Sequence, residues 1–126
     1  MTGRVVHFEV PYDDAERARS FYGEVFGWQV AHIPELSYDI VSTGPVSDQG
    51  MPTEPGFIGG GLTQRGDNVP RPVIVIAVED LDATLEQVRA RGGSAVGEKV
   101  PVADMGTAAY FTDSEGNLMG LWQNAT

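Results

Sequence analysis

Val5-Val6-His7-Phe8-Glu9-Val10 is the stretch that decides the fold of this chain. It reads as a β-strand, whose side chains alternate between two faces. This alternation places Phe8 with its apolar neighbours Val6 and Val10 on one face, and His7 with Glu9 on the other. A helix can cover the apolar face, whereas a histidine and a carboxylate need polar company. The pair is therefore a candidate for metal ligands, for an acid/base pair or for the wall of a wet cavity.

A helix pattern follows this strand, and the same order of elements then occurs a second time. Apolar residues at three- and four-residue spacing between Ala15 and Val25 predict an amphipathic helix, which Asp13 or Asp14 caps and Gly27 ends. The other predicted elements are strands over residues 28–33, 37–42, 56–64, 73–78, 95–100, 107–112 and 118–123, and a second helix that begins near Leu81 and ends at Gly92.

The duplicated order predicts an α+β fold of two tandem βαβββ modules, at about residues 1–66 and 72–126, within a single domain of 126 residues. One module alone leaves a face of its sheet bare. The two are therefore expected to form a cup-shaped curved sheet around a cleft, either within one chain or across a homodimer. The turn-rich segment 43–55 is long for a connection, and we expect a surface loop that either joins two strands or covers the cleft.

The composition argues against several classes of function. The formal charge of −10 and the absence of a Lys/Arg cluster argue against binding to nucleic acid or to an anionic membrane. A cationic small ligand would be favoured electrostatically, and the alternative is an acidic surface that serves solubility alone. The chain has no cysteine, so a metal would have to be held by His, Asp or Glu. The chain passes directly into a strand, and no apolar run approaches the length of a membrane span, so we expect a cytoplasmic protein.

Three groups of motifs resemble the vicinal oxygen chelate superfamily, which includes glyoxalase I, bleomycin resistance proteins and extradiol dioxygenases. They are His7-Phe8-Glu9-Val10-Pro11-Tyr12-Asp13-Asp14 with Phe21-Tyr22 and Val25-Phe26-Gly27-Trp28; Val78-Glu79-Asp80-Leu81-Asp82 with Gly92-Gly93; and Phe111-Thr112-Asp113-Ser114-Glu115-Gly116-Asn117 with Leu121-Trp122. Together they cover nearly the whole chain. The resemblance implies paired modules around a cup-shaped site, usually in a homodimer or a fused double module.

For the metal-dependent members, the resemblance implies ligands from the first strand and the last strand of each module. These four positions fall on His7, Gly61, Val73 and Gly120. Only His7 can coordinate a metal, and Glu9 can add at most one further ligand, whereas protein zinc sites use three or four. The chain therefore resembles a member with a degenerate metal site. No cofactor is predicted, and a divalent metal held through His7 is the alternative.

The missing ligands predict a pocket in place of a metal site. Glycine at positions 61 and 120 is expected to leave space, and a concave, partly apolar cavity with a few polar groups suits a small molecule. Trp122 shares a strand face with Gly120, and Phe57 shares one with Gly61 if the strand is regular. The predicted ligand-binding residues are His7, Glu9, Phe57, Gly61, Val73, Val75, Gly120 and Trp122. A ligand with a cationic or aromatic part would suit them.

Three functions are compatible with these residues. The first is metal-independent binding of a small molecule, similar to the bleomycin resistance branch, for sequestration or resistance. The second is a lyase or isomerase of the glyoxalase type, with or without a metal, in which His7 and Glu9 are the catalytic residues that transfer a proton. The third is a dimerisation or regulatory module without a dedicated ligand, which a filled cleft would favour. His32 has no matching role in the superfamily.

Overall fold

Each half of the chain forms one βαβββ module in the structure, a computed structural model that describes residues 3–126. Module one runs from His7 to Pro72, and module two consists of Val73–Thr126 with residues 3–6. Gly3 and Arg4 join module two through backbone hydrogen bonds. The Gly3 N–H donates to the Ala77 carbonyl at 2.7 Å, and the Ala77 N–H donates to the Arg4 carbonyl at 2.9 Å.

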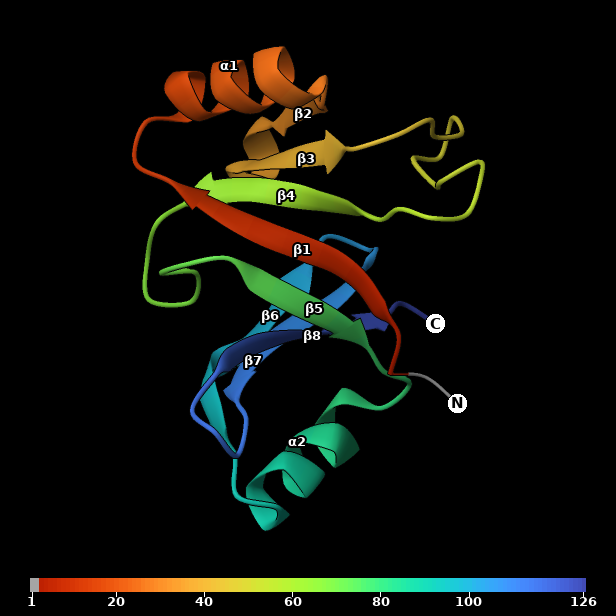
Figure 1. Cartoon of the computed structure of the whole chain (residues 1–126). Helices are drawn as coiled ribbons and strands as arrows, with labels where there is room; N and C mark the ends of the chain where they lie inside the picture. The colour runs from red at the N-terminus through yellow and green to blue at the C-terminus, as the bar shows by residue number, and fades with distance from the viewer. Residues whose placement is uncertain (1–2) are drawn as a thin grey trace. The chain divides into compact units, whose positions relative to one another are not determined.

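Module one places its helix beside a four-stranded sheet (Figure 1). Its elements are β1 (Val5–Tyr12), α1 (Ala15–Phe26), β2 (Gln29–Ile33), the short 3-10 helix η1 (Pro34–Leu36), β3 (Tyr38–Ser42) and β4 (Gly59–Gln64). The strand order is β2-β3-β4-β1, in which β1 and β4 are parallel and the other pairs are antiparallel. The Asp14 side chain caps α1 by accepting from the Arg17 N–H at 3.0 Å. Gly27 ends the helix in the left-handed conformation, at φ 73°.

Module two repeats this order with a better packed helix. Its elements are β5 (Val73–Ala77), α2 (Leu81–Ala90), β6 (Ser94–Val102), β7 (Gly106–Thr112) and β8 (Leu118–Asn124), and its strand order is β5-β8-β7-β6. Leu81 and Leu85 of α2 pack with Ala109, Phe111 and Leu121 in one buried cluster. Burial of these side chains is the main stabilising term for a helix on a sheet.

The first helix is packed differently, because none of its residues is buried. Tyr22 stacks on Trp28 with ring centroids 4.6 Å apart, and Trp28 in turn lies 5.5 Å from Phe8 of β1. Phe21 and Phe26 stay 55% and 60% exposed. Phe8 on the apolar face of β1 is therefore packed against aromatic rings, while part of the α1 surface stays open to solvent.

The structure confirms the predicted α+β class and the βαβββ order of both modules. The largest difference in a boundary is at β4, which begins at Gly59, so the segment 56–58 belongs to the preceding loop. This loop projects beyond the end of β3 (Figure 1) and is held by its own bonds, such as the Ser47 N–H to the Met51 carbonyl at 2.8 Å. Within residues 3–126, neither helix is long and apolar enough to cross a membrane.

Candidate functional site

The predicted pair His7 and Glu9 is joined by a third residue, Tyr38 of β3. The Tyr38 hydroxyl donates to Glu9 Oε2 at 2.9 Å, and His7 Nε2 lies 2.8 Å from the same hydroxyl oxygen. Strand alternation places His7 and Glu9 on one face of β1, as the sequence predicted. The Glu9 side chain is only 7% exposed, so its carboxylate depends on polar partners. Glu9 and Tyr38 each make a further interaction besides these bonds.

Tyr38 reaches this position because Gly61 has no side chain. In the β-ladder, Gly61 of β4 lies between Glu9 on β1 and Ile40 on β3. A Cβ atom at Gly61 would overlap the ring and hydroxyl of Tyr38. The expectation that Gly61 leaves open space is therefore wrong. The phenol fills the space, and the glycine is required by the close approach of an aromatic ring.

The electrostatics of this cluster favour a neutral imidazole. Burial lowers the pKa of His7 from its ordinary value, while the charge of Glu9 acts in the opposite direction with the smaller effect. Near neutral pH, His7 is therefore uncharged beside the Glu9 side chain. A neutral imidazole has one nitrogen that donates a hydrogen bond and one that accepts.

A second polar cluster lies on the other face of β3 and holds α1 to the sheet. Asp39 is 0% exposed, and its carboxylate accepts from Arg19 Nε at 2.7 Å and lies 2.6 Å from His32 Nδ1. Burial alone would raise the pKa of Asp39, but the bonds and charges of Arg19 and His32 together outweigh burial, so the pKa is lowered. His32 thus lies in a structural cluster on the opposite face from Tyr38.

The predicted residues of module two form an apolar group. Val75 and Gly120 are ladder partners in β5 and β8, and a Cβ at Gly120 would lie 3.0 Å from Val75 Cγ2 and 3.6 Å from Val73 Cγ1. The valine side chains thus occupy the space that the sequence assigned to an opening at Gly120. The Trp122 ring lies over Gly106, and its indole N–H donates to Asn124 Oδ1 at 2.7 Å.

Phe57 does not share a strand face with Gly61, because it precedes β4. Its ring lies against Gly44, where a Cβ would be only 2.8 Å from the ring carbons. The Thr43 hydroxyl bonds the Ile58 carbonyl at 2.7 Å and closes the base of the same loop. The prediction that Phe57 shares a strand face with Gly61 is therefore wrong, since the chain joins the ladder only at Gly59.

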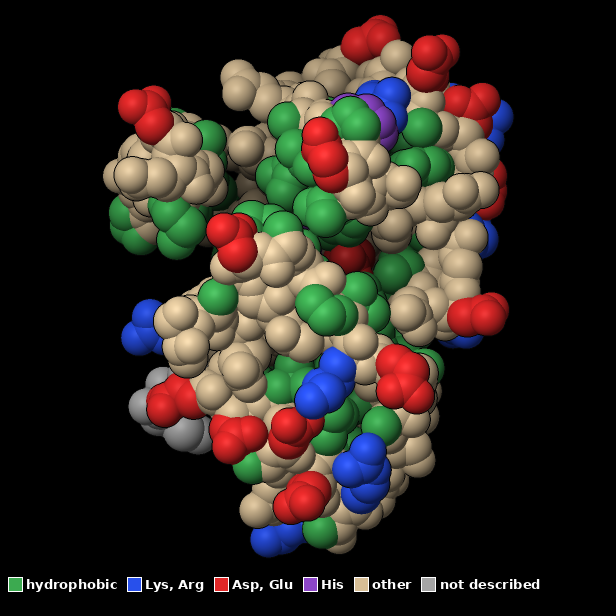
Figure 2. All heavy atoms as spheres, turned by 180° about the vertical axis from the view of Figure 1, so that it is seen from behind, with side chains coloured by type: hydrophobic (Ala, Val, Ile, Leu, Met, Phe, Trp, Pro, Cys, Tyr) green, Lys and Arg blue, Asp and Glu red, His purple; other side chains and the backbone are tan. Residues whose placement is uncertain are grey.

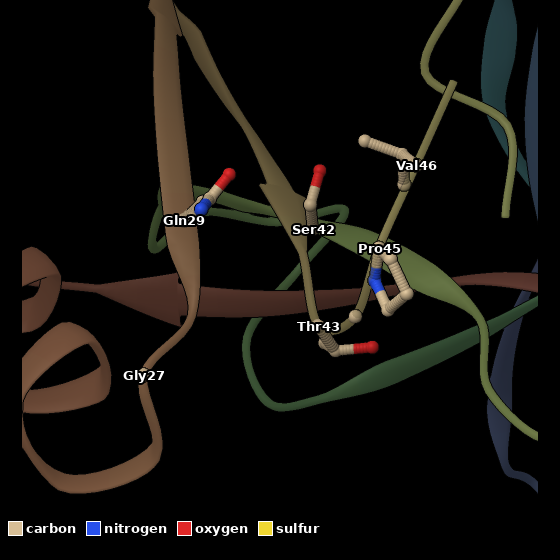
Figure 3. Close-up of a pocket in the computed structure, with 7 residues that line it drawn as sticks. Gly27, Gln29, Ser42, Thr43, Pro45 and Val46 are labelled. Atoms are coloured by element: carbon tan, nitrogen blue, oxygen red, sulfur yellow. The ribbon is translucent and has the colours of Figure 1, made fainter. Parts of the chain in front are cut away.

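Module one also carries a shallow pocket of about 490 Å³ beside this loop (Figure 3). Gln29 and Ser42, ladder partners on β2 and β3, line it together with Thr43, Pro45 and Val46. None of the residues predicted from the sequence lines this pocket. It is distinct from the cluster of His7, Tyr38 and Glu9.

Tyr38 is the member of the site that sequence reasoning missed. The sequence pattern predicted a strand over residues 37–42, but it did not connect Tyr38 with His7. The run Gly59-Gly60-Gly61 was the available signal, because glycines in a strand often lie under a large aromatic side chain of a neighbouring strand. Phe8 covers Gly60 on one face of the sheet in the same way that Tyr38 covers Gly61 on the other.

These residues do not fit a divalent metal site of the superfamily type. Within residues 3–126, no three His, Asp or Glu side chains lie close enough together to hold a metal ion. The position where a carboxylate would project from Gly61 is filled by a phenol that is hydrogen-bonded to Glu9. The positions at Val73 and Gly120 offer no donor side chain.

Comparison with known proteins gives matches in sequence and in structure. The family model described as "bleomycin resistance protein-like N-terminal" matches residues 4–44. A glyoxylase-like domain-containing protein from Didymella fabae is 30% identical over 124 residues, which cover 94% of this chain and 92% of that protein. A probable lactoylglutathione lyase from Vibrio parahaemolyticus is 29% identical over 127 residues, which cover 97% and 91%.

The fold is also shared with solved structures. The crystal structure of methylmalonyl-CoA epimerase from Mycobacterium tuberculosis superposes with a TM-score of 0.65 at 19% identity, over 98% of this chain and 89% of that one. Both sequence relatives match over nearly their full length, and the fold agrees with the resemblance of the motifs. The chain therefore belongs to the glyoxalase/bleomycin resistance/dioxygenase group of proteins, the vicinal oxygen chelate superfamily.

Proposed function

We propose that this protein is a metal-independent small-molecule-binding member of the superfamily. The observation that carries the proposal is the position of Tyr38, whose hydroxyl bonds both His7 and Glu9 over Gly61. This arrangement replaces a set of metal ligands with a wall of hydrogen-bonding groups. A few fixed polar groups beside apolar surface are typical of small-molecule sites.

Charge supports a ligand with a cationic or aromatic part. The Glu9 carboxylate is buried in the site, and the whole chain carries a formal charge of −10. Acidic side chains are spread over the face in Figure 2, and the Lys and Arg side chains there are interspersed with them. Such a surface repels nucleic acid phosphates and attracts small cations. Sequestration of a toxic compound is the role that fits this property best.

The test is a thermal-shift screen of amines and aromatic compounds against the wild type, Glu9→Gln and Glu35→Gln. Glu35 is exposed and lies on η1, so its variant makes the same change of charge away from the site. A compound that binds the native state raises Tm. We expect compounds that stabilise the wild type and Glu35→Gln but have little effect on Glu9→Gln. If no compound shows this dependence on Glu9, the proposal fails.

Metal dependence is tested in the same preparations. The proposal predicts no stoichiometric metal in protein purified without a tag, and no increase in Tm with equimolar nickel, zinc or manganese. Metal bound in a 1:1 ratio in the wild type but lost in His7→Ala would overturn the metal-independent assignment. It would instead support the alternative of a divalent metal held through His7.

Proton transfer by His7 and Glu9 is the second candidate, supported by the bonded array and by a relative named as a probable lactoylglutathione lyase. In this case, Glu9 removes a proton from a carbon next to a carbonyl and later returns one, while Tyr38 donates to its carboxylate and His7 holds the Tyr38 hydroxyl in place. Incubation of methylmalonyl-CoA or lactoylglutathione in D2O would reveal deuterium at that carbon. Exchange that Glu9→Gln abolishes and Glu35→Gln retains would favour this enzyme over the binding protein.

We further propose that the protein is a cytoplasmic homodimer. The exposed apolar side chains of α1 support a dimer, since Phe21, Val25 and Phe26 are each more than half exposed. Light scattering after size exclusion should give a mass near 27 kDa, which is about twice the 13.5 kDa of one chain. A mass near 13.5 kDa at micromolar concentration would contradict the dimer.

A further inference from the structure

The direction of the hydrogen bonds around Tyr38 follows from its single hydroxyl hydrogen. That hydrogen points to Glu9 Oε2, at an oxygen–oxygen distance of 2.9 Å. A phenol has one O–H group, so Tyr38 cannot donate to His7 at the same time. The contact of 2.8 Å between His7 and Tyr38 must therefore have His7 as the donor.

This direction determines where the hydrogen lies on the imidazole of His7. Nε2 carries a hydrogen, because it donates to the Tyr38 oxygen. Burial lowers the pKa of His7, so the ring holds one hydrogen near neutral pH. A neutral ring with its hydrogen on Nε2 has an unshared electron pair on Nδ1. Tyr38 and Glu9 together thus select one of the two tautomers.

Among the residues that the structure describes, none donates a hydrogen bond to Nδ1 of His7. Across residues 3–126, the imidazole makes no hydrogen bond besides the one to Tyr38. The ring is half-buried, so bulk water reaches it only in part. In contrast, Nδ1 of His32 lies 2.6 Å from the Asp39 carboxylate and is fully engaged. A half-buried acceptor gains when a ligand supplies its missing donor.

We propose that His7 Nδ1 is the acceptor for a hydrogen-bond donor of the ligand, so that the site selects small molecules with a hydroxyl, amine or ammonium group. This inference rests on the proposed function, because it names the chemical class that the binding site takes. Molecules of similar shape without a donor displace water from Nδ1 of this half-buried ring and supply no hydrogen bond in its place. They are therefore bound more weakly.

The first test measures the tautomer of His7 in the protein without added ligand. Long-range proton–nitrogen NMR at pH 7.5 distinguishes a ring with hydrogen on Nε2 from one with hydrogen on Nδ1. The His32→Gln variant assigns the remaining signals to His7. We expect hydrogen on Nε2 in the wild type, and a mixture of the two tautomers in Tyr38→Phe, which removes the acceptor. Hydrogen on Nδ1 in the wild type would overturn the inference.

The second test compares phenol with anisole, which differs from phenol by a methyl group in place of the donor hydrogen. Titrations are followed through the His7 signals. One hydrogen bond of about 1 kcal/mol predicts that phenol binds on the order of fivefold more tightly than anisole. His7→Phe keeps a ring but loses the acceptor, so a titration followed by Tm should show no preference. Equal binding of the two probes to the wild type, or no response to either, would overturn the inference.

The two proposals fail in different ways. If the screen finds Glu9-dependent ligands but donor-free compounds bind as tightly as their donor-bearing counterparts, the binding function stands and the role of His7 Nδ1 is wrong. If the screen finds no Glu9-dependent ligand, the binding function itself is wrong, whatever the tautomer of His7.

Discussion

Removal of a single oxygen atom, in Tyr38→Phe, should destabilise the protein while leaving its packing intact. The phenyl ring still fills the space over Gly61, so no cavity forms. The buried Glu9 side chain loses a hydrogen bond of 2.9 Å, and His7 Nε2 loses its acceptor at 2.8 Å. A hydrogen bond to a charged group contributes roughly 1.5–3 kcal/mol and a neutral one about 1 kcal/mol, so we expect a loss of about 2–3 kcal/mol after partial relaxation. For a chain of this length, that loss lowers Tm by on the order of 8–11 °C.

The matched control for this prediction is Tyr22→Phe in the same module. The Tyr22 ring stacks on Trp28, and its hydroxyl makes no hydrogen bond among the described residues, so its loss should change stability by less than about 0.5 kcal/mol. Urea denaturation followed by circular dichroism gives the free energy of unfolding of both variants. If Tyr38→Phe is as stable as Tyr22→Phe, the bonded array of His7, Tyr38 and Glu9 does not stabilise the native state, and the reasoning is refuted.

Three further predictions concern the glycine, the second cluster and pH. Gly61→Ala should lower the free energy of unfolding by about 1–3 kcal/mol, because the added Cβ overlaps Tyr38. The control Gly66→Ala, whose Cβ meets nothing closer than 3.9 Å, should have almost no effect on urea denaturation. Equal effects of the two variants would contradict the close packing of Tyr38 on Gly61. Asp39→Asn should lower the free energy of unfolding by about 2–4 kcal/mol, because it removes the charge that holds Arg19. Backbone amides of α1 should then exchange hydrogen faster. Unchanged exchange would contradict the role of Asp39 in anchoring α1. The pKa of His7 is lowered in the folded state, so the unfolded chain binds more protons below the ordinary value of about 6.5, and stability should fall as pH falls through and below that value. His7→Gln should reduce this slope in urea titrations from pH 7.5 to 5, and an unchanged slope would mean that His7 is not its source.

The two modules have the same order of elements, but their helices are held to the sheet in different ways. In module two, Leu81 and Leu85 anchor the helix through apolar burial. In module one, Arg19 reaches the buried Asp39, so a charged bond replaces part of the apolar contact. Apolar residues on α1 are thereby left on the surface, where they support the proposed dimer.

Local patterns in the sequence determined the elements and the fold class. Strand alternation predicted that His7 and Glu9 share a face, and helix spacing with the glycine stop predicted α1 to end at Gly27. Such features depend on residues close in the chain, so periodicity and capping reveal them. The motifs also indicated the superfamily, because their order along the chain matches the two-module arrangement of its members.

Tertiary structure alone decided what occupies the positions of the missing metal ligands. Tyr38 lies 29 residues after Glu9 and 31 after His7, and only the pairing of β3, β4 and β1 brings its hydroxyl between them. A glycine in the sequence does not say whether it leaves a cavity or makes room for a ring from another strand. That choice depends on the register of the strands and on side-chain direction, and here it turned an expected opening at Gly61 into a hydrogen-bonded wall.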